Sequence, residues 1–294
     1  MPLSFSVVVP TRSRVESLTR CLEGLQPQIQ GAAAEIIVTD DGDDMRTRDM
    51  IAAKFPAIRW TAGPRRGPAA NRNHGASLAN GEFIVFVDDD VVPSAGLLTG
   101  YGKAVRPGVH VYEGRTTCEA GLRSPLETSP VNETGGHLWS CNMMVRRSFW
   151  REFGGFDEDF PFPHMEDVAF RECLNAAGEQ FVFVPVASVD HPPRRLPPAS
   201  ARVRHHESSF IFEYKYFGTG PSRRLFWREF VSYYLRLIVK REKGRDSLLA
   251  MGSMCLEAYG VLKHWRGWEE KHRHLGENPI LKRRSIQRGV SPQT

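Results

Sequence analysis

Strands and helices alternate four times within about the first 90 residues of the chain. The strand-like apolar runs are residues 4–9, 35–39, 58–61 and 83–87. Between the first two, Val15, Leu18, Leu22 and Leu25 fall at the spacing of a helix with one buried face. Such alternation is typical of a parallel sheet covered by helices. We therefore predict an α/β fold that binds its ligand outside the carboxyl ends of the strands.

Three adjacent carboxylates, Asp88, Asp89 and Asp90, follow the fourth apolar run. Because neighbouring negative charges repel one another, they favour a bound cation at this point. If the backbone stays extended past Val87, Asp88 and Asp90 point to one side and Asp89 to the other. That pair would suit Mg²⁺ or Mn²⁺ held together with substrate phosphates. A charged turn without a ligand is the alternative.

Polar residues also end the first two runs, at Thr11 and at Asp40 and Asp41. Neither the GxGxxG dinucleotide motif nor the GxxxxGK[ST] phosphate loop occurs in the sequence. If the chain binds phosphate, a metal ion is therefore the simplest way for it to do so.

The composition is that of a globular protein, with 41% hydrophobic and 25% charged residues. Five scattered cysteines without a CxxC pair indicate free thiols in a reducing compartment, which predicts a cytoplasmic protein. The first residues lack the basic region of a signal peptide, and there is no run of 18 apolar residues.

Charge is divided unevenly along the chain. Residues 1–191 carry 18 Lys and Arg against 25 Asp and Glu, whereas residues 192–294 carry 21 against 9, a balance of +12. An acidic first part argues against nucleic acid as a partner, since phosphate neutralisation needs basic residues. The basic second part could face anionic lipid, an anionic acceptor or solvent.

Five segments resemble, in order, the motifs of family-two glycosyltransferases. They are VVVPTRSR at 7–14, EIIVTDDG at 35–42, GPAANRNHGASLANGEFIVFVDDDVVP at 67–93, GGFDEDF at 154–160 and EDVAFRECLNAAG at 166–178. The resemblance covers about residues 4–191. It implies a GT-A type fold, with a mostly parallel nucleotide-binding sheet flanked by helices. It also implies metal-dependent transfer of a sugar from a nucleoside diphosphate sugar to an acceptor hydroxyl, with inversion at the anomeric carbon.

The resemblance assigns the nucleoside side of the site to Pro10, Thr11, Arg12 and Asp41. Asp41 matches the carboxylate that reads the base. A carboxylate can accept the imide N–H of uracil or thymine or the N1–H of guanine, so a UDP, dTDP or GDP sugar is expected. Alternatively, Asp40–Asp44 only cap the next helix, and Thr11 lies in a plain turn.

The diphosphate side is assigned to Arg72, Asp88 and Asp89, and the Mn²⁺ or Mg²⁺ ion to Asp90 and His191. Arg72 would form charge-assisted hydrogen bonds to the diphosphate, unless it is a solvent-facing helical arginine. The middle Asp89 leaves open whether Asp88 or Asp89 assists Asp90. A histidine before two prolines, as His191 is, can also be purely structural.

The acceptor side is assigned to Asp167, Glu166, Trp139 and Asn142. Asp167 matches the catalytic base and Glu166 a residue that helps to hold the acceptor. Both fall in the predicted first turn of a helix, where the dipole stabilises an ionised carboxylate. Acidic residues are common there for that reason alone, and core packing is an equally good account of Trp139.

We expect a catalytic domain at 1–191, with a nucleotide-sugar half at about 1–105 and an acceptor half at about 106–191. A Pro-rich connector at 192–200 precedes a basic, aromatic helical region at 201–275 and a basic, disordered tail at 276–294. Within the helical region, residues 203–217 and 223–243 are predicted helices. Residues 223–245 could lie on a membrane or pack back on the protein, and a homo-oligomer is a further alternative.

Two functions from other classes fit parts of the sequence. Asp88, Asp90 and Val92 match the D-x-D-x-[TV] motif of haloacid-dehalogenase phosphohydrolases, in which Asp88 would be the nucleophile. That motif belongs on the first strand of its domain, whereas three strands precede it here. A non-catalytic nucleotide-sugar binding protein would not need both Asp90 and Asp167.

Overall fold

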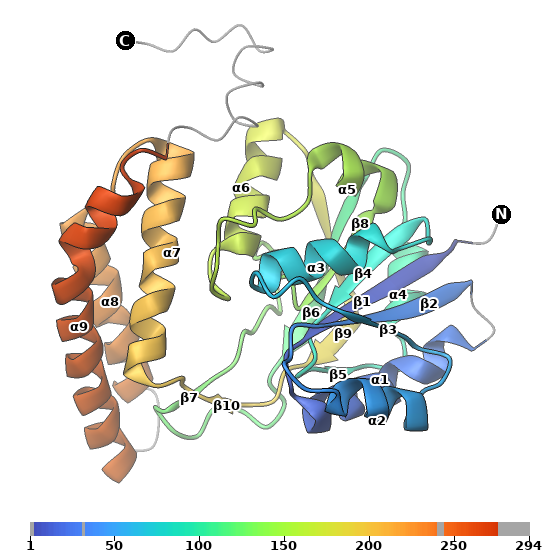
Figure 1. Cartoon of the computed structure of the whole chain (residues 1–294), viewed down its shortest axis with the longest axis horizontal. Coiled ribbons are helices and arrows are strands. Elements are labelled where there is room, and N and C mark those ends of the chain that lie inside the picture. Colours follow the sequence, from blue (N-terminus) through green and yellow to red (C-terminus); the bar gives the residue numbers. More distant parts are fainter. Residues whose placement is uncertain (1–2, 31–32, 240–243, 276–294) are drawn as a thin grey trace, which may run out of the picture. The chain divides into compact units, whose positions relative to one another are not determined.

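The computed structural model describes residues 3–30, 33–239 and 244–275 (Figure 1). It divides into two compact units. Unit 1 comprises Met1–Glu119, Pro130–Pro161 and Glu166–Pro192, and unit 2 comprises Ala120–Ser129, Phe162–Met165 and Pro193–Thr294. Two short segments inside the predicted catalytic region, 120–129 and 162–165, therefore belong to the helical unit. The predicted disordered tail at 276–294 lies outside the described residues.

The first half of unit 1 is a parallel sheet in the order β3-β2-β1-β4. Its strands are β1 (Phe5–Thr11), β2 (Ala34–Asp40), β3 (Arg59–Ala62) and β4 (Phe83–Val87). The helices that connect them are α1 (Val15–Ile29), α2 (Arg46–Lys54) and α3 (Pro68–Ser77). Because β1, β2 and β4 run in parallel, their carboxyl ends lie at one edge, which brings Thr11, Asp41 and Asp88 to that edge.

The second half of unit 1 continues the same sheet in mixed directions. Its strands are β5 (Val92–Pro93), β6 (Val111–Thr117), β8 (Asn142–Arg146) and β9 (Phe181–Asp190), and its helices are α4 (Leu97–Ala104), α5 (Arg147–Phe153) and α6 (Glu166–Ala177). Strand β8 is antiparallel to both β4 and β6, whereas β9 is parallel to β6 and antiparallel to β5. The resulting sheet has eight strands in the order β3-β2-β1-β4-β8-β6-β9-β5.

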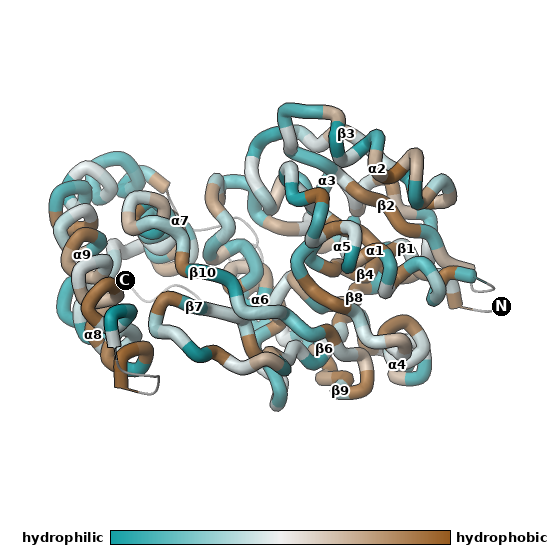
Figure 2. Tube along the Cα trace, turned by 90° about the horizontal axis from the view of Figure 1, so that it is seen from below, coloured by the Kyte–Doolittle hydropathy of each residue, from teal (hydrophilic) through white to brown (hydrophobic). Residues whose placement is uncertain are grey.

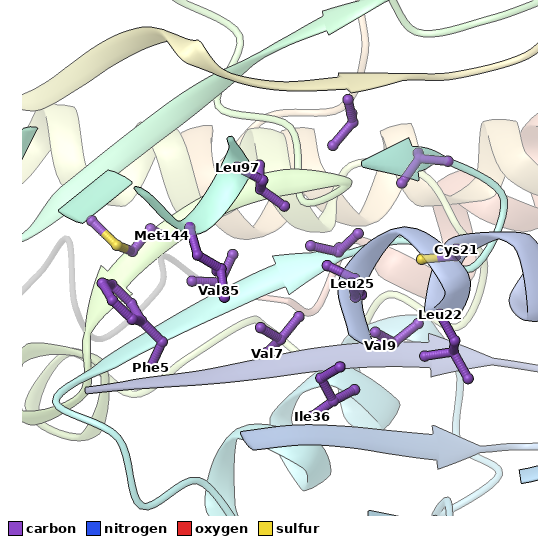
Figure 3. Packing of buried hydrophobic residues seen from close by; sticks show 14 of the residues in the cluster. Phe5, Val7, Val9, Cys21, Leu22, Leu25, Ile36, Val85, Leu97 and Met144 are labelled. Carbon is purple, nitrogen blue, oxygen red and sulfur yellow. The ribbon is translucent and has the colours of Figure 1, made fainter. Parts of the chain in front are cut away.

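Apolar side chains on both faces of the central strands form the core of unit 1. Every residue of β4 is buried, and Figure 2 shows hydrophobic colour along β2, β4 and β8. On one face, Leu22 and Leu25 of α1 lie beside Val7 and Val9 of β1 (Figure 3). A strand that is buried on both faces reads as a continuous apolar run, as residues 83–87 do, whereas the edge strand β3 is partly exposed.

Helix α3 approaches the sheet closely because Gly75 has no side chain. A Cβ atom at Gly75 would lie 2.4 Å from Cγ1 of Val8 and 3.1 Å from Cγ2 of Thr39. This close approach places Asn71 and Arg72 of α3, both buried, at the polar edge of the sheet.

Unit 2 contains a short antiparallel pair and long helices. The strands are β7 (Glu127–Thr128) and β10 (Arg194–Arg195), and the helices are α7 (Ala199–Phe217), α8 (Arg223–Val239) and α9 (Arg245–His272). Aromatic residues dominate its core, in which the ring of Phe210 packs 4.8 Å from that of Trp265 and 5.2 Å from that of Trp268.

The helix predictions for this region need correction. α7 begins four residues before the predicted 203, inside the proline-rich segment, and the described part of α8 ends at Val239. The longest helix, α9, had no separate prediction, because its apolar and polar residues do not alternate at one clear helical period. Within the described parts of the chain, no helix is both long enough and apolar enough to cross a membrane.

Candidate active site at the carboxyl edge of the sheet

The backbone turns at Asp89 and Asp90 between the end of β4 and β5. The condition considered above, an extended backbone past Val87, is therefore not met. The physical reason is a pair of contacts from the last residue of β1 and the loop that follows it. Thr11 Oγ1 donates a hydrogen bond to Asp89 Oδ2 at 2.6 Å, and Arg14 Nη1 lies 3.0 Å from Asp89 Oδ1.

Asp89 is consequently a buried residue of the loop framework. Its two carboxylate oxygens are held by Thr11 and Arg14, and burial raises the pKa of Asp89 to about 7 against the opposing charge of Arg14. Arg14 Nη1 also lies 2.9 Å from Asp90 Oδ2. Arg14 was missed as a site residue, although the charge balance of three adjacent carboxylates called for a nearby cation.

Asp90 faces His191 across the sheet edge. His191 is buried, and its Nε2 lies 3.3 Å from Asp90 Oδ1. The other ring nitrogen, Nδ1, lies 3.1 Å from the carbonyl oxygen of Pro192, which can only accept a hydrogen bond. Nδ1 therefore carries the proton, and in the neutral ring Nε2 directs a lone pair toward the carboxylate.

This pair fits a divalent cation. Carboxylate oxygen and imidazole nitrogen are accepted ligands of Mn²⁺, and two acceptor atoms facing each other are held together by a shared proton or a cation. Among residues 3–30, 33–239 and 244–275, no group of three or more His, Cys, Asp or Glu side chains could hold a metal ion. Asp90 and His191 would thus supply part of a coordination sphere that substrate phosphates complete.

Arg72 connects the end of β4 to the start of α6. Its Nη2 lies 2.6 Å from Asp88 Oδ1, and its Nη1 lies 3.1 Å from Glu166 Oε1. Although burial opposes the charge, Asp88 and Glu166 raise the pKa of Arg72 above its usual value. In this structure the positive charge predicted to reach a diphosphate is shared between two carboxylates. Glu166 Oε2 and Arg72 Nε are buried without a hydrogen-bond partner among the described residues.

Asp167 is the second residue of α6 and follows Glu166 of this cluster. Its Oδ1 accepts a hydrogen bond from the backbone N–H of Val168 at 2.8 Å, and the backbone of Ser140 also donates to the carboxylate. Burial raises the pKa of Asp167, while the charge of Arg72 lowers it. Burial, together with the charge of Asp167, raises the pKa of Glu166 to about 7. Asp167 is partly exposed, as a group that must meet a substrate needs to be.

Backbone groups surround Asp41, the residue predicted to read the base. Its Oδ1 accepts the backbone N–H of Arg65 at 2.9 Å, and its own N–H donates to the carbonyl of Thr11. Burial raises the pKa of Asp41, whereas the backbone N–H of Arg65 and the charge of Arg12 lower it. A Cβ atom at Gly63 would lie 2.2 Å from Asp41 Oδ1, so only glycine fits behind this carboxylate.

The loop after β1 also has a buried support that the sequence reading overlooked. Asn71 Nδ2 donates to the carbonyls of Thr11 and Thr39, and its Oδ1 accepts from Thr39 Oγ1. Pro10 is buried in β1 opposite Thr39, while Arg12 is exposed. Asn71 directly precedes Arg72 in the motif at residues 67–93, and this position was the one sequence signal that could have identified it as a site residue.

The acceptor-side predictions divide into two kinds. Asn142 is buried in β8, and its two amide hydrogens are donated to the carbonyls of Arg115 and Ala187, so it belongs to the framework of the sheet. Trp139 is partly buried, and its ring stacks on His137 at 4.6 Å between ring centres. The stacked rings of His137 and Trp139 belong to a loop that the buried Glu113 anchors.

Glu113 was also missed. Its carboxylate accepts from Asn132 Nδ2 at 3.0 Å, from the backbone N–H of Leu138 at 2.8 Å and from that of Gly136. One buried carboxylate thus fixes the loop that leads to Trp139 and Ser140. The chain before this loop includes the end of β6 and the short strand β7.

Comparison with known proteins finds that the chain is similar to glycosyltransferases. Residues 6–108 match the model of glycosyl transferase family 2. The pre-mycofactocin glycosyltransferase of Mycobacterium tuberculosis is 27% identical over 205 residues, which cover 63% of this chain and 42% of that protein. The N-acetylglucosaminyl-diphospho-decaprenol L-rhamnosyltransferase of the same species is 34% identical over 176 residues, which cover 56% of this chain and 54% of that protein. The chain thus matches about half the length of these relatives.

A solved structure supports the fold. The mannosyltransferase PcManGT from Pyrobaculum calidifontis, in complex with GDP-Man and Mn²⁺, superposes with a TM-score of 0.52 at 15% identity and covers 100% of this chain and 89% of its own. The mixed, mostly parallel sheet flanked by helices is the GT-A fold of these glycosyltransferases. Residues 6–108 therefore match glycosyl transferase family 2, and the chain has the fold of these glycosyltransferases.

Proposed function

We propose that the chain is an inverting, metal-assisted glycosyltransferase that moves a sugar from a nucleoside diphosphate sugar to an acceptor hydroxyl. The observation that carries the proposal is the bridge made by Arg72 between Asp88 and Glu166. It joins the acidic end of β4 to the first turn of α6, which carries Asp167. A donor site and a base are therefore parts of one connected cluster.

On the donor side, Asp41 accepts an N–H of the base, which favours UDP, dTDP or GDP sugars. Asp90 and His191 would hold Mn²⁺ or Mg²⁺, and the bound ion would supply the positive charge that neutralises the leaving diphosphate. Arg72 reaches the diphosphate by exchanging a carboxylate partner for a phosphate oxygen, both of which accept charge-assisted hydrogen bonds.

On the acceptor side, Asp167 accepts the proton of the incoming hydroxyl. The hydroxyl oxygen then forms a bond to the anomeric carbon as the bond from that carbon to the diphosphate oxygen breaks on the opposite face, which inverts the configuration. The raised pKa of Asp167 makes its carboxylate a better proton acceptor than an exposed aspartate. Glu166, anchored by Arg72, orients the acceptor beside it.

The names of the two mycobacterial relatives suggest acceptor classes for this chain. One is named for N-acetylglucosaminyl-diphospho-decaprenol and the other for pre-mycofactocin, so a hydroxyl on a saccharide, a lipid-linked sugar or a small molecule is the proposed acceptor.

The decisive experiment compares Asp167→Asn with the wild-type chain. After a screen of nucleoside diphosphate sugars with Mn²⁺ has found the donor, Asp167→Asn should bind it with unchanged affinity and transfer the sugar about 10²- to 10⁴-fold more slowly, because the base is lost. Glu172→Gln, in the same helix, is the matched control and should transfer normally. Normal transfer by Asp167→Asn would remove the base assignment.

The same screen separates the other two functions. Release of inorganic phosphate from simple phosphate esters, lost in Asp88→Asn, would identify a phosphohydrolase. Donor binding without any transfer or hydrolysis by the wild-type chain would identify a binding protein.

A further inference from the structure

The outward face of α9 is unusually apolar for a helix that meets water. Glu257 is the only charged residue between Leu248 and Leu262, and its side chain points inward and is buried. Large hydrophobic side chains along this run are exposed, and Figure 2 shows hydrophobic stretches along α9. These side chains are Leu248, Leu249, Met251, Leu256, Tyr259 and Leu262. Four turns of exposed apolar surface without a charge indicate a face that is covered when the protein works.

A groove continues from this face toward α7. Its volume is about 750 Å³, and Leu256 and Tyr259 of the apolar face line it together with the buried Trp268. Gly260 lets the two helices approach, since a Cβ atom there would lie 2.5 Å from Cγ2 of Val203. The apolar surface is therefore partly concave, with an aromatic wall.

The rim of the groove is basic. Arg204, Lys263 and His264 line it, whereas its one carboxylate, Glu207, is already paired with Lys271 at 2.7 Å and His272 at 2.8 Å. Arg245 and Arg266, both exposed, flank the apolar run at its two ends. An apolar band bordered by cations is the pattern of a helix that lies in the interface of an anionic bilayer.

We propose that this apolar face of α9, with the groove that it forms with α7, docks on an anionic lipid bilayer. Charge complementarity selects this occupant over a second copy of the chain. In an antiparallel pairing of two α9 helices, Arg245 of one copy would meet Lys263 and Arg266 of the other, and in a parallel pairing each cation would meet its own counterpart. Like charges oppose both arrangements, whereas phosphate headgroups neutralise the same cations.

The structure also shifts this role from α8, where the sequence suggested it, to α9. The exposed apolar residues of α8, such as Leu225 and Leu235, are interrupted by exposed arginines, among them Arg224, Arg228 and Arg236. The run on α9 is uninterrupted, so α9 is the better candidate for insertion among lipid chains.

Vesicle sedimentation with the full chain tests the proposal. The wild-type protein should bind vesicles that contain about 30% phosphatidylglycerol and should not bind pure phosphatidylcholine, because the basic rim needs anionic headgroups. Leu256→Glu should weaken binding at least tenfold, since it places a charge in the apolar face. Val186→Glu in unit 1 is the matched control, because Leu256 and Val186 are both 66% exposed, and it should bind as wild type does.

The contribution of charge is measured separately. Lys263→Ala with Arg266→Ala should weaken binding about twentyfold. The control with equal loss of charge, Lys54→Ala with Lys103→Ala, should leave it unchanged. Inorganic phosphate that displaces the vesicles when chloride of equal ionic strength does not would show that the groove recognises free phosphate, and would overturn the bilayer as the occupant.

Two further results would also overturn the proposal. One is equal vesicle binding by the wild type and Leu256→Glu. The other is a wild-type dimer in sedimentation velocity that Leu256→Glu makes monomeric, without vesicle binding by either, which would assign the face to a second copy.

Discussion

Arg72 is the residue whose charge opposes the effect of burial on the proposed base. Burial raises the pKa of both Asp167 and Glu166, while the guanidinium of Arg72 lowers both. A base acts in its ionised form, so transfer should increase with pH through the raised pKa of Asp167. The acid limb of the kcat/KM profile should therefore lie above pH 4, the usual value of an aspartate.

Arg72→Met should move that acid limb to higher pH by about one to two units. The limb moves to higher pH because removal of a nearby positive charge destabilises the ionised carboxylate of Asp167 and so raises its pKa. Arg46→Met, which removes an exposed arginine paired with Asp44, should leave the limb in place. A profile of kcat/KM against pH at saturating Mn²⁺ measures both, and an unshifted limb in Arg72→Met would contradict the electrostatic role.

At the scale of the elements, a buried polar cluster holds the helices of unit 2 together. Glu257 of α9 accepts hydrogen bonds from Arg202 and His206 of α7 and from Tyr234 of α8. Burial alone would raise the pKa of Glu257, yet these hydrogen bonds and the charge of Arg202 lower it. The lowered pKa of Glu257 shows that its hydrogen-bond partners stabilise the ionised carboxylate.

Glu257→Gln should destabilise the protein by about 3 kcal/mol, because it leaves the buried charge of Arg202 without its partner. Glu229→Gln removes a carboxylate whose ion pair with Arg228 is solvent-exposed, and should cost less than about 0.5 kcal/mol. Urea unfolding followed by circular dichroism gives both free energies. Equal small losses would mean that the cluster adds nothing beyond a surface pair.

Local sequence patterns predict some of the helices and strands but not others. The strands and helices from β1 to β4 could be predicted because each buried run and each helical stripe is written in adjacent residues. The insertion of β8 between β4 and β6 could not, since the pairing of Phe86 with Met143 joins residues far apart in the chain. α9 was missed because its exposed face is as apolar as a buried one.

The same limit applies within the site. The acidic end of β4 and Asp167, the proposed base, could be named as candidates from their motifs, and His191 from the family resemblance. The turn at Asp89 could not be foreseen, because it is imposed by Thr11 and Arg14, more than 70 residues earlier. Framework roles such as those of Asn71, Glu113 and Asn142 depend on backbone carbonyls and N–H groups that only the folded chain brings together.

At the scale of the whole molecule, the proposed metal ligands come from distant parts of the chain. Asp90 follows β4 near the middle of the sequence of unit 1, and His191 follows β9 near its end. A cation bound by both would hold these two segments together and would stabilise the folded state over the unfolded one by mass action. Nucleotide and metal should therefore raise Tm together by more than the sum of their separate effects, because the phosphates complete the coordination sphere.

We expect a nucleoside diphosphate at about 100 times its Kd to raise Tm by about 5 °C or more with Mn²⁺ present, and EDTA to remove most of that rise. His191→Ala and Asp90→Ala should each lose the part of the Tm rise that depends on Mn²⁺. Both should keep the part of the rise that depends on nucleotide alone. His74→Ala, which removes a histidine bonded to Thr61 elsewhere in the same unit, should keep both. A rise in Tm that is the same in EDTA and in Mn²⁺ would mean that the positive charge at the diphosphate comes from Arg72 and Arg14 instead.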